Sequence, residues 1–388
     1  MSSLGSVVSS SLHPFHTFIW KIASGCNINC SYCFVYNKAD TRWKLQPPLM
    51  SKEVAQKTIS RIVEHCIRHQ KKEVSIIFHG GEPLLGGVQH LHQLFTLLAN
   101  GFKDTGIEYQ VGIQSNGLLF SGEIGDLLLE SKASIGISVD GPPEVNDKNR
   151  VDHFGRPTSR KLEEKLQLLL SPRYRSLFAG FLCVIDPATD PIRVIDYLLE
   201  FSPPGIDFLL PHYNHVDLPP EKKKNSSDKS YGDWLTVAFD HWIQTESATQ
   251  IRIFESIIST LCGGYSGVES LGTNPIDLIV VETNGDVEAV DSLKSTFEGA
   301  TSLGYNVFEN DFSTIASDPR VRLRQMQVQG LCQNCKNCSI VDICGGGYIP
   351  HRYAGGTDFN NPSVYCFDLK EIINHVSRKV ESELIKIT

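Results

Sequence analysis

Three cysteines near the N-terminus, Cys26, Cys30 and Cys33, are spaced closely enough to share one metal centre. Their segment, GCNINCSYCFVYN, follows an apolar stretch at residues 16–22. Four cysteine thiolates saturate a [4Fe–4S] cube, so three leave one iron without a protein ligand. An open coordination position allows a metal site to bind a substrate or cofactor. A zinc site is the alternative, but structural zinc takes four ligands and no fourth cysteine lies nearby.

A second group of five cysteines lies near the C-terminus, in the segment CQNCKNCSIVDICGGGYIPHRY and at Cys366. Clustered cysteines in a chain without an export signal indicate metal or redox ligands rather than disulfides. Structural zinc is one interpretation, because pairs of cysteines two residues apart are typical of zinc sites. The remaining cysteines stand alone among apolar or helical neighbours, where a free cysteine is typically a small buried hydrophobe: Cys66, Cys183 and Cys262.

The spacing of the first cluster, with Tyr32 at its aromatic position, resembles that of radical S-adenosylmethionine (SAM) enzymes. Further motifs of that superfamily follow in order, each after an apolar stretch: GGEP, then QSNG, then SVDG. The resemblance implies a [4Fe–4S] cluster whose open iron binds SAM. Reduction of SAM then produces a radical that removes a hydrogen atom from the substrate. In such chemistry the cofactor supplies the radical, and the protein supplies orientation and exclusion of water.

The same resemblance implies which residues contact SAM. The loop with Gly80, Gly81 and Glu82 is expected to bind the amino group, because glycines allow close approach of the backbone and a carboxylate accepts from an ammonium. The other expected contacts are Tyr32, Asn116, Ser138 at the ribose, and Arg150 or Arg160 at the SAM carboxylate.

The second cysteine group resembles the SPASM extension of radical SAM peptide-modifying enzymes. The full SPASM pattern holds two auxiliary [4Fe–4S] clusters. Here Tyr348 stands where that pattern has a cysteine, and the hairpin segment TNGDVEAVDSLK contains none. The resemblance therefore implies one auxiliary cluster that carries electrons or braces the fold, with Cys332 left over. Its expected ligands are Cys335, Cys338, Cys344 and Cys366.

Wording such as CGGGYIPHRY, NPSVYC, EAVDSLK and FLLPHYNH resembles the cyclophane-forming radical SAM/SPASM peptide maturases. This implies that a ribosomally made precursor peptide loses a Cβ hydrogen and that this carbon bonds to an aromatic ring two residues earlier. An external electron donor of the flavodoxin or ferredoxin type is implied as well.

Two other functions remain open. An anaerobic sulfatase-maturating-type enzyme, which oxidises Cys or Ser to formylglycine, resembles this chain in its motifs but normally keeps all SPASM cysteines. A non-catalytic zinc scaffold is the other alternative, and the GGEP, SNG and SVDG motifs between the cysteine groups argue against it.

The expected reaction also needs a base. Asp291 in the hairpin and Asp217, His212 and His215 in the segment HYNHVD are the candidates, although an aspartate after a strand often caps a turn. The strand near residues 278–290 is predicted to bind the peptide by β-addition at a sheet edge.

Alternating elements must position these residues. The apolar pattern predicts strands at 16–22, 74–80, 108–114, 134–139, 177–184 and 206–210, with helices between them. Such βαβ units form parallel sheets, and six of them predict an α/β partial (β/α)6 barrel with chemistry at the C-terminal strand ends. A hairpin around Asn284-Gly285 and a final helix at 367–387 belong to a cysteine-rich α+β extension.

Composition sets the remaining limits. The expected parts are a tail at 1–15, the barrel at 16–218, a polar loop at 219–230 and the SPASM-like extension at 231–388. The net charge of −8, with scattered basic residues, argues against binding to nucleic acid. No stretch is apolar enough to span a membrane, and the first residues lack a signal peptide, so a cytoplasmic location is expected.

Overall fold

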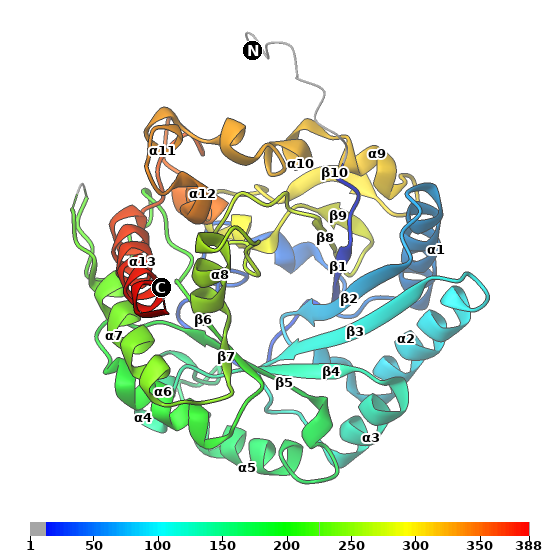
Figure 1. Cartoon of the computed structure of the whole chain (residues 1–388). Coiled ribbons are helices and arrows are strands. Elements are labelled where there is room, and N and C mark those ends of the chain that lie inside the picture. Colours follow the sequence, from blue (N-terminus) through cyan, green and yellow to red (C-terminus); the bar gives the residue numbers. More distant parts are fainter. Residues whose placement is uncertain (1–12, 225, 388) are drawn as a thin grey trace.

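A computed structural model describes residues 13–224 and 226–387. Its centre is an arc of six parallel strands that pair in chain order (Figure 1). These strands are β1 (Thr17–Ala23), β2 (Glu73–Gly80), β3 (Glu108–Ser115), β4 (Ser134–Ser138), β5 (Phe178–Val184) and β6 (Gly205–Leu209). The predicted partial barrel is confirmed, and each predicted strand lies within two residues of its observed bounds.

Helices connect the strands and cover the outside of the arc (Figure 1). They are α1 (Lys52–Arg68), α2 (Gly87–Phe102), α3 (Gly122–Ser131), α4 (Pro143–Asn149), α5 (Ser159–Leu169) and α6 (Pro191–Glu200). Helix α1 begins directly after Ser51, whose side chain accepts a hydrogen bond from the Val54 backbone amide. Short 3-10 turns complete this half: η1 (Arg42–Leu45), η2 (Pro83–Gly86) and η3 (Arg175–Leu177).

The C-terminal half extends the same sheet at both ends. The ten strands run in the order β10-β9-β8-β1-β2-β3-β4-β5-β6-β7. The added strands are β7 (Gln250–Ile251), β8 (Leu278–Val281), β9 (Asp286–Glu288) and β10 (Ser302–Asn306). Strand β8 lies between β1 and β9, and β9 lies between β8 and β10. The prediction that residues 278–290 accept a peptide by β-addition is therefore wrong, because their backbone edges are already paired.

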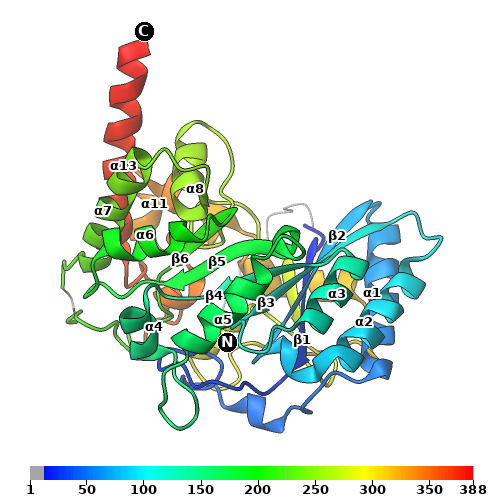
Figure 2. The same cartoon turned by 90° about the horizontal axis from the view of Figure 1, so that it is seen from below.

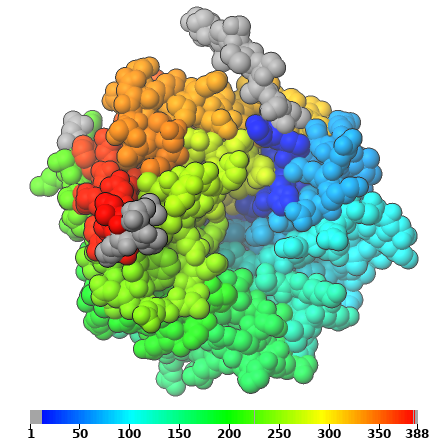
Figure 3. Space-filling model, in the orientation of Figure 1, coloured from blue at the N-terminus to red at the C-terminus, as the bar shows by residue number. Residues whose placement is uncertain are grey.

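Three longer helices cover the β6 end of the sheet: α7 (Ser230–Gln244), α8 (Arg252–Leu261) and α13 (Cys366–Ile387). Helix α13 packs on α7 and α8, and its C-terminal end projects away from the barrel in Figure 2, while Figure 3 shows the helix at the surface. The cysteine-rich part consists of short pieces: η4 (Asp291–Ser295), α9 (Phe312–Ala316), α10 (Pro319–Leu323), η5 (Gln327–Gly330), α11 (Gln333–Lys336), α12 (Val341–Cys344) and η6 (Ile349–Arg352).

One continuous apolar core joins both halves, with Phe18, Trp20 and Phe78 of the barrel and Tyr365 of the extension fully buried. The proposed division into barrel and extension stays a prediction, and residues 1–12 of the expected tail lie outside the described residues. Within the described part of the chain, no helix combines the length and apolar character that crossing a membrane requires.

Candidate active site at the strand ends

The loop that follows β1 carries Cys26, Cys30 and Cys33, all free thiols. Backbone hydrogen bonds hold this loop against the end of α4, from Asn29 to Val151 and from Ser31 to Asn149. Burial raises the pKa of Cys26 to about 12 and that of Cys30 to about 11. Burial thus favours the neutral thiol at both positions. Coordination of a metal would deprotonate these thiols, because the metal supplies the positive charge that stabilises the thiolate.

The glycine-rich loop after β2 touches the cysteine loop directly. The amide of Gly81 donates to the Ala23 carbonyl, and the amide of Glu82 donates to the Gly25 carbonyl. A Cβ atom at Gly80 would lie 2.0 Å from the Ala23 carbonyl oxygen, and one at Gly81 would lie 1.8 Å from the Tyr36 hydroxyl. Both positions therefore need glycine for the two loops to approach this closely.

The carboxylate of Glu82 points toward the end of β3, and its contact with a SAM amino group stays a prediction. It accepts hydrogen bonds from the Ser115 hydroxyl at 2.8 Å and from the backbone amides of Leu84 and Asn116. Glu82 is fully buried, and each of its oxygens already has a partner. Its carboxylate thus joins the ends of β2 and β3, a bracing role that the position in the motif did not reveal.

Asn116 and Ser138 lie at the C-terminal ends of the neighbouring strands β3 and β4, as the QSNG and SVDG motifs predict. The side-chain amide of Asn116 donates to Asn27 at 2.7 Å and lies 3.7 Å from the Cys26 sulfur. Ser138 accepts a hydrogen bond from Gln114 of the adjacent strand. Asn116 is therefore positioned to hold the first cysteine of the loop.

Arg150 is buried and lies beside the cysteine loop, whereas the side chain of Arg160 is 95% exposed. The guanidinium of Arg150 donates to the Tyr32 hydroxyl at 2.9 Å, and that hydroxyl donates to Asp140 at 2.6 Å. Of the two arginine candidates, only Arg150 is near the site. Asp140, which sequence reasoning did not single out, completes this buried chain of hydrogen bonds.

Asp291 lies at the same end of the sheet, in η4. One carboxylate oxygen forms an ion pair with Lys21 of β1 at 2.7 Å, and the other is buried with no hydrogen-bond partner in the part of the chain that the structure describes. Burial by itself favours the neutral acid, but Lys21 and Lys294 outweigh it and hold the pKa of Asp291 below its usual value. The result is an ionised carboxylate with one free acceptor oxygen, as a general base requires.

Lysine and glutamate side chains surround Asp291. The ammonium of Lys294 lies 3.1 Å from Glu282 and 2.9 Å from Glu288, and all three are buried. Glu282, Glu288 and Asp291 lie close enough together to ligate an ion. Lys294 already places its positive charge between the two glutamates, so the protein itself offsets part of the negative charge of this cluster.

Of the other predicted bases, Asp217 and His215 lie elsewhere, whereas His212 lies near Asp291 and the cysteine loop. Asp217 is half exposed and pairs with Lys38 at 2.7 Å. His215 binds the Pro362 carbonyl and lines a cavity with the C-terminal cysteines, so it does not reach the β1 end. His212 contacts the ring of Phe34 beside Cys33, and burial lowers its pKa to about 4. Lys21 and His79, which adjoin each other on β1 and β2, were the missed neighbours of Asp291.

Four C-terminal cysteines line one cavity of about 500 Å³, as expected for one auxiliary cluster: Cys335, Cys338, Cys344 and Cys366. Cys332 is buried beside Cys335 and is not part of the lining. Cys66 and Cys183 are buried as expected. Cys262 is exposed instead, because it ends α8 at the surface.

The sulfur spacing distinguishes a cube from zinc. Sulfurs around one tetrahedral zinc ion lie ~3.8 Å apart, given the usual zinc–sulfur bond length. In residues 13–224 and 226–387, no trio of ligand atoms that includes a cysteine sulfur fits within 4.8 Å. Thiolates on a four-iron cube lie farther apart, because each binds a different iron. Among the described residues, neither cysteine group therefore has the sulfur spacing of an assembled zinc site.

Comparisons with known proteins agree with this geometry. The family model described as the Radical SAM superfamily matches residues 20–171. The chain is 26% identical to a cysteine-type anaerobic sulfatase-maturating enzyme of Clostridium perfringens, over 93% of this chain and 96% of that protein. It is 23% identical to a serine-type enzyme of Bacteroides thetaiotaomicron, over 89% and 85% respectively.

A solved structure has the same fold. The structure titled "Native anSMEcpe with bound AdoMet and Cp18Cys peptide" has a TM-score of 0.79 and 24% identity. The match covers 95% of this chain and 98% of that one. At this level of identity the likeness establishes the fold, including the cysteine-bearing C-terminal extension.

These relatives overturn the prediction of cyclophane formation. Both are named as sulfatase-maturating enzymes, and each matches this chain over most of its length. The missing SPASM cysteines did not exclude a sulfatase-maturating enzyme. Only the cysteines expected for one auxiliary cluster are missing, and the rest of the chain still aligns with those enzymes. The prediction that SAM and an iron–sulfur cluster are the cofactors is confirmed at the level of the superfamily. The chain thus has the α/β radical SAM fold, and its residues 20–171 match the Radical SAM superfamily.

Proposed function

We propose that this protein oxidises a cysteine or serine side chain of a peptide to formylglycine, as an anaerobic sulfatase-maturating-type enzyme. The main support is the environment of Asp291, whose buried carboxylate pairs with Lys21 through one oxygen and has no partner for the other among the described residues. Lys21 also acts electrostatically on Cys33 of the first cysteine loop, so the carboxylate adjoins the proposed cluster. The similarity to cysteine-type and serine-type enzymes supports the substrate class.

Cys26, Cys30 and Cys33 would hold the catalytic cluster, and the four cysteines of the second cavity would hold one auxiliary cluster. When bound, SAM and these clusters supply the radical that removes a Cβ hydrogen and the acceptor for one further electron. The protein contributes the surroundings. Glu82 fixes the loops after β2 and β3, and Arg150 with Tyr32 fixes the loop after β1.

Asp291 is the proposed general base for the substrate hydroxyl or thiol. Loss of one hydrogen atom from Cβ, one proton from the side-chain heteroatom and one electron converts serine to the aldehyde. Cysteine gives a thioaldehyde by the same losses, and water then replaces sulfur, releasing hydrogen sulfide. Asp291 would take the proton on its free oxygen, while Lys21 keeps that carboxylate ionised beforehand.

A peptide and an external electron donor of the flavodoxin or ferredoxin type are the proposed partners. The structural neighbour named above carries a peptide, which supports a peptide substrate for this fold. The electron released in each turnover would pass to the auxiliary cluster, whose cavity adjoins the surface lysines Lys223 and Lys224.

Mass spectrometry of sulfatase-derived peptides tests the proposal. The anaerobically reconstituted enzyme, SAM and a reductant are incubated with matched peptides carrying Cys, Ser or Ala at the target position. We expect an aldehyde, trapped by a hydrazide reagent, in the Cys or Ser peptide and none in the Ala peptide. Aldehyde-free products, or a cross-link between two side chains, would overturn formylglycine formation.

A further inference from the structure

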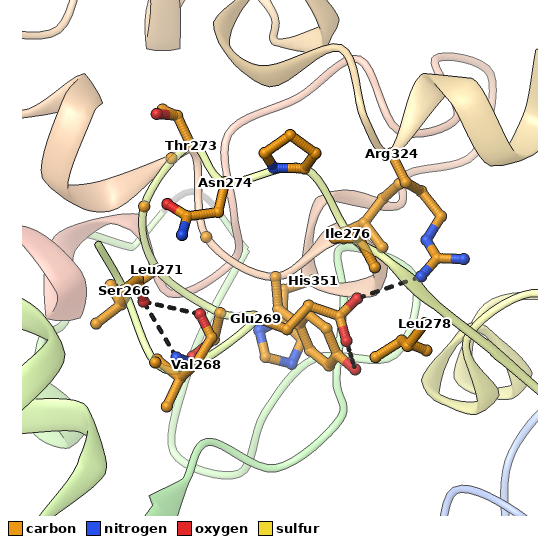
Figure 4. Close-up of a pocket in the computed structure, with 18 of the residues that line it drawn as sticks. Ser266, Val268, Glu269, Leu271, Thr273, Asn274, Ile276, Leu278, Arg324 and His351 are labelled. Carbon is orange, nitrogen blue, oxygen red and sulfur yellow. Dashed lines mark hydrogen bonds and ion pairs between the residues drawn. The ribbon is translucent and has the colours of Figure 1, made fainter. Parts of the chain in front are cut away.

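A cavity of about 650 Å³ lies between the barrel and the extension, and none of the four auxiliary cysteines lines it (Figure 4). Residues 266–278 form one wall, and His212, Tyr348 and His351 form another. Drug-sized ligands occupy cavities of this volume in many proteins. No residue of the cavity has a role in the oxidation proposed above, so its purpose requires a separate explanation.

Arg324, which directly follows α10, brings a guanidinium to this cavity. Its side chain is 2% exposed, and its Nε, Nη1 and Nη2 atoms have no hydrogen-bond partner among residues 13–224 and 226–387. A guanidinium has five N–H donors, and burying them unpaired is costly. The nearest carboxylate oxygen, of Glu269, lies 3.8 Å away, which is an ion pair but too long for a hydrogen bond (Figure 4).

The surroundings of Arg324 are suited to a ligand with one negative charge. One Glu269 oxygen accepts a hydrogen bond from Tyr348 at 3.2 Å, and the other stays 3.8 Å from Arg324, so Glu269 does not satisfy the guanidinium donors. A phosphate dianion would bring two charges next to this buried glutamate, and a carboxylate would bring one. Ser266, Thr273 and Asn274 offer polar groups on the same wall, while apolar side chains line the space between: Leu271, Ile276 and Leu278 (Figure 4).

We propose that this cavity is a binding site for a carboxylate with a short apolar body, anchored by the Arg324 guanidinium. Arginine matches a carboxylate in a two-pronged geometry, which would satisfy the donors left unpaired in the protein. The carboxylate belongs either to a free small acid or to a glutamate side chain of a bound peptide. The site is independent of formylglycine formation, because neither Asp291 nor a cysteine lines it.

Thermal-shift titration of the anaerobically prepared holoenzyme tests this site without measuring activity. The probes are butyrate as a free acid, N-acetyl-glutamate amide as a peptide side chain, inorganic phosphate, and butyramide as a neutral match for butyrate. We expect saturable stabilisation by butyrate or the capped glutamate, weaker binding of phosphate and none of butyramide. The tighter of the two carboxylates identifies the source of the ligand.

Three variants decide whether Arg324 is the anchor. Arg324→Gln should weaken carboxylate binding about tenfold or more, since a charged hydrogen-bond pair is lost. Glu269→Gln should strengthen it, because the competing buried charge is removed, and this arm decides the matter if Arg324→Gln folds poorly. Arg193→Gln, the same change at a 67% exposed side chain, serves as the control. Equal binding of butyramide, or carboxylate binding unaltered by both cavity variants, would overturn the proposal.

Discussion

Single residues at the Asp291 end of the sheet show how a buried acid is kept ionised. Two lysines, Lys21 and Lys294, face three carboxylates there, and each lysine makes an ion pair of 3.1 Å or shorter. Burial raises the pKa of Glu288 to about 7, with Lys294 opposing it, whereas the pKa of Asp291 is lowered. The difference arises because Asp291 has Lys21 as its own partner.

Asp291→Asn should reduce peptide oxidation by about 10²-fold or more, because the variant keeps the shape but cannot accept a proton. Cleavage of SAM should continue, since Asp291 acts on the substrate proton. The measurement is aldehyde formed against 5′-deoxyadenosine released. Asp217→Asn, at a half-exposed carboxylate paired with Lys38, is the matched control and should behave as wild type. Loss of both products in Asp291→Asn would contradict a role as base.

Lys21→Met tests the electrostatic part of the same argument. Removing the ion-pair partner leaves burial less opposed, so the pKa of Asp291 should rise. In the wild type the pKa of Asp291 is lowered, so the carboxylate stays ionised across the usual assay range. The pH–rate profile of the wild-type enzyme should therefore be flat from pH 8 down to about 5.5. The variant should lose activity at a higher pH than wild type does. Identical acid limbs in the two profiles would argue that Asp291 is not the group titrated.

Residue types and order were enough to select candidate ligands and a candidate base, but they do not indicate the direction of each side chain. Glu82 stands in the expected motif, but its carboxylate accepts hydrogen bonds from the Ser115 hydroxyl and the Asn116 backbone amide. His215 is two residues from Asp217 in sequence, and its ring turns to the Pro362 carbonyl. A local pattern cannot indicate these partners, because they come from distant parts of the chain.

At the scale of elements, the glycine loop after β2 sets the position of the cysteine loop. Gly81→Ala places a methyl group within 2.0 Å of the Gly25 carbonyl oxygen and against the Tyr36 hydroxyl, so the loops must separate. We expect lower iron content and weaker SAM binding in this variant. Gly355→Ala, where no atom lies within 4 Å of the added carbon, is the control. Full iron loading of Gly81→Ala would show that the close approach is unnecessary.

The short elements α11 and α12 present the auxiliary cysteines. If two cubes are bound, the wild type should contain about eight iron atoms per chain, four for each cluster. The double variant Cys335→Ala/Cys338→Ala should retain about four and still cleave SAM, while peptide oxidation is lost. Iron quantification with electron paramagnetic resonance checks this. Cys332→Ala is the control, since Cys332 lies outside the cavity lining and should leave the iron content unchanged.

The alternation of apolar and helical stretches was sufficient to predict β1 to β6 and their order, because each crossover is local in sequence. The pairing of β8 with β1 was not predictable in the same way. These strands are separated by the entire barrel, and only the folded sheet brings them together. That pairing carries Asp291 to the end of β1 and also removes the edge that a peptide was expected to use.

Across the whole molecule, buried histidines link folding stability to pH. Burial lowers the pKa of His65 to about 3 and those of His79 and His212 to about 4. The unfolded chain binds protons at these positions below about pH 6.5, whereas the folded chain does not. Stability is therefore fully present above that pH and falls as the pH decreases toward the folded values, by about 1.4 kcal/mol per pH unit for each histidine.

His65 allows this dependence to be separated from loss of the clusters, because it stacks on Phe15 beneath α1, away from the cysteine loops. His65→Gln cannot titrate, so its urea midpoint should fall less than that of the wild type between pH 6.5 and 5. The difference between the two proteins in how the free energy of unfolding changes with pH should approach the value for one proton, about 1.4 kcal/mol per pH unit. His92→Gln, at an exposed position on α2, should keep the wild-type slope. Equal slopes for His65→Gln and wild type would show that acid acts on the clusters first, and that the neutral histidine core does not limit stability.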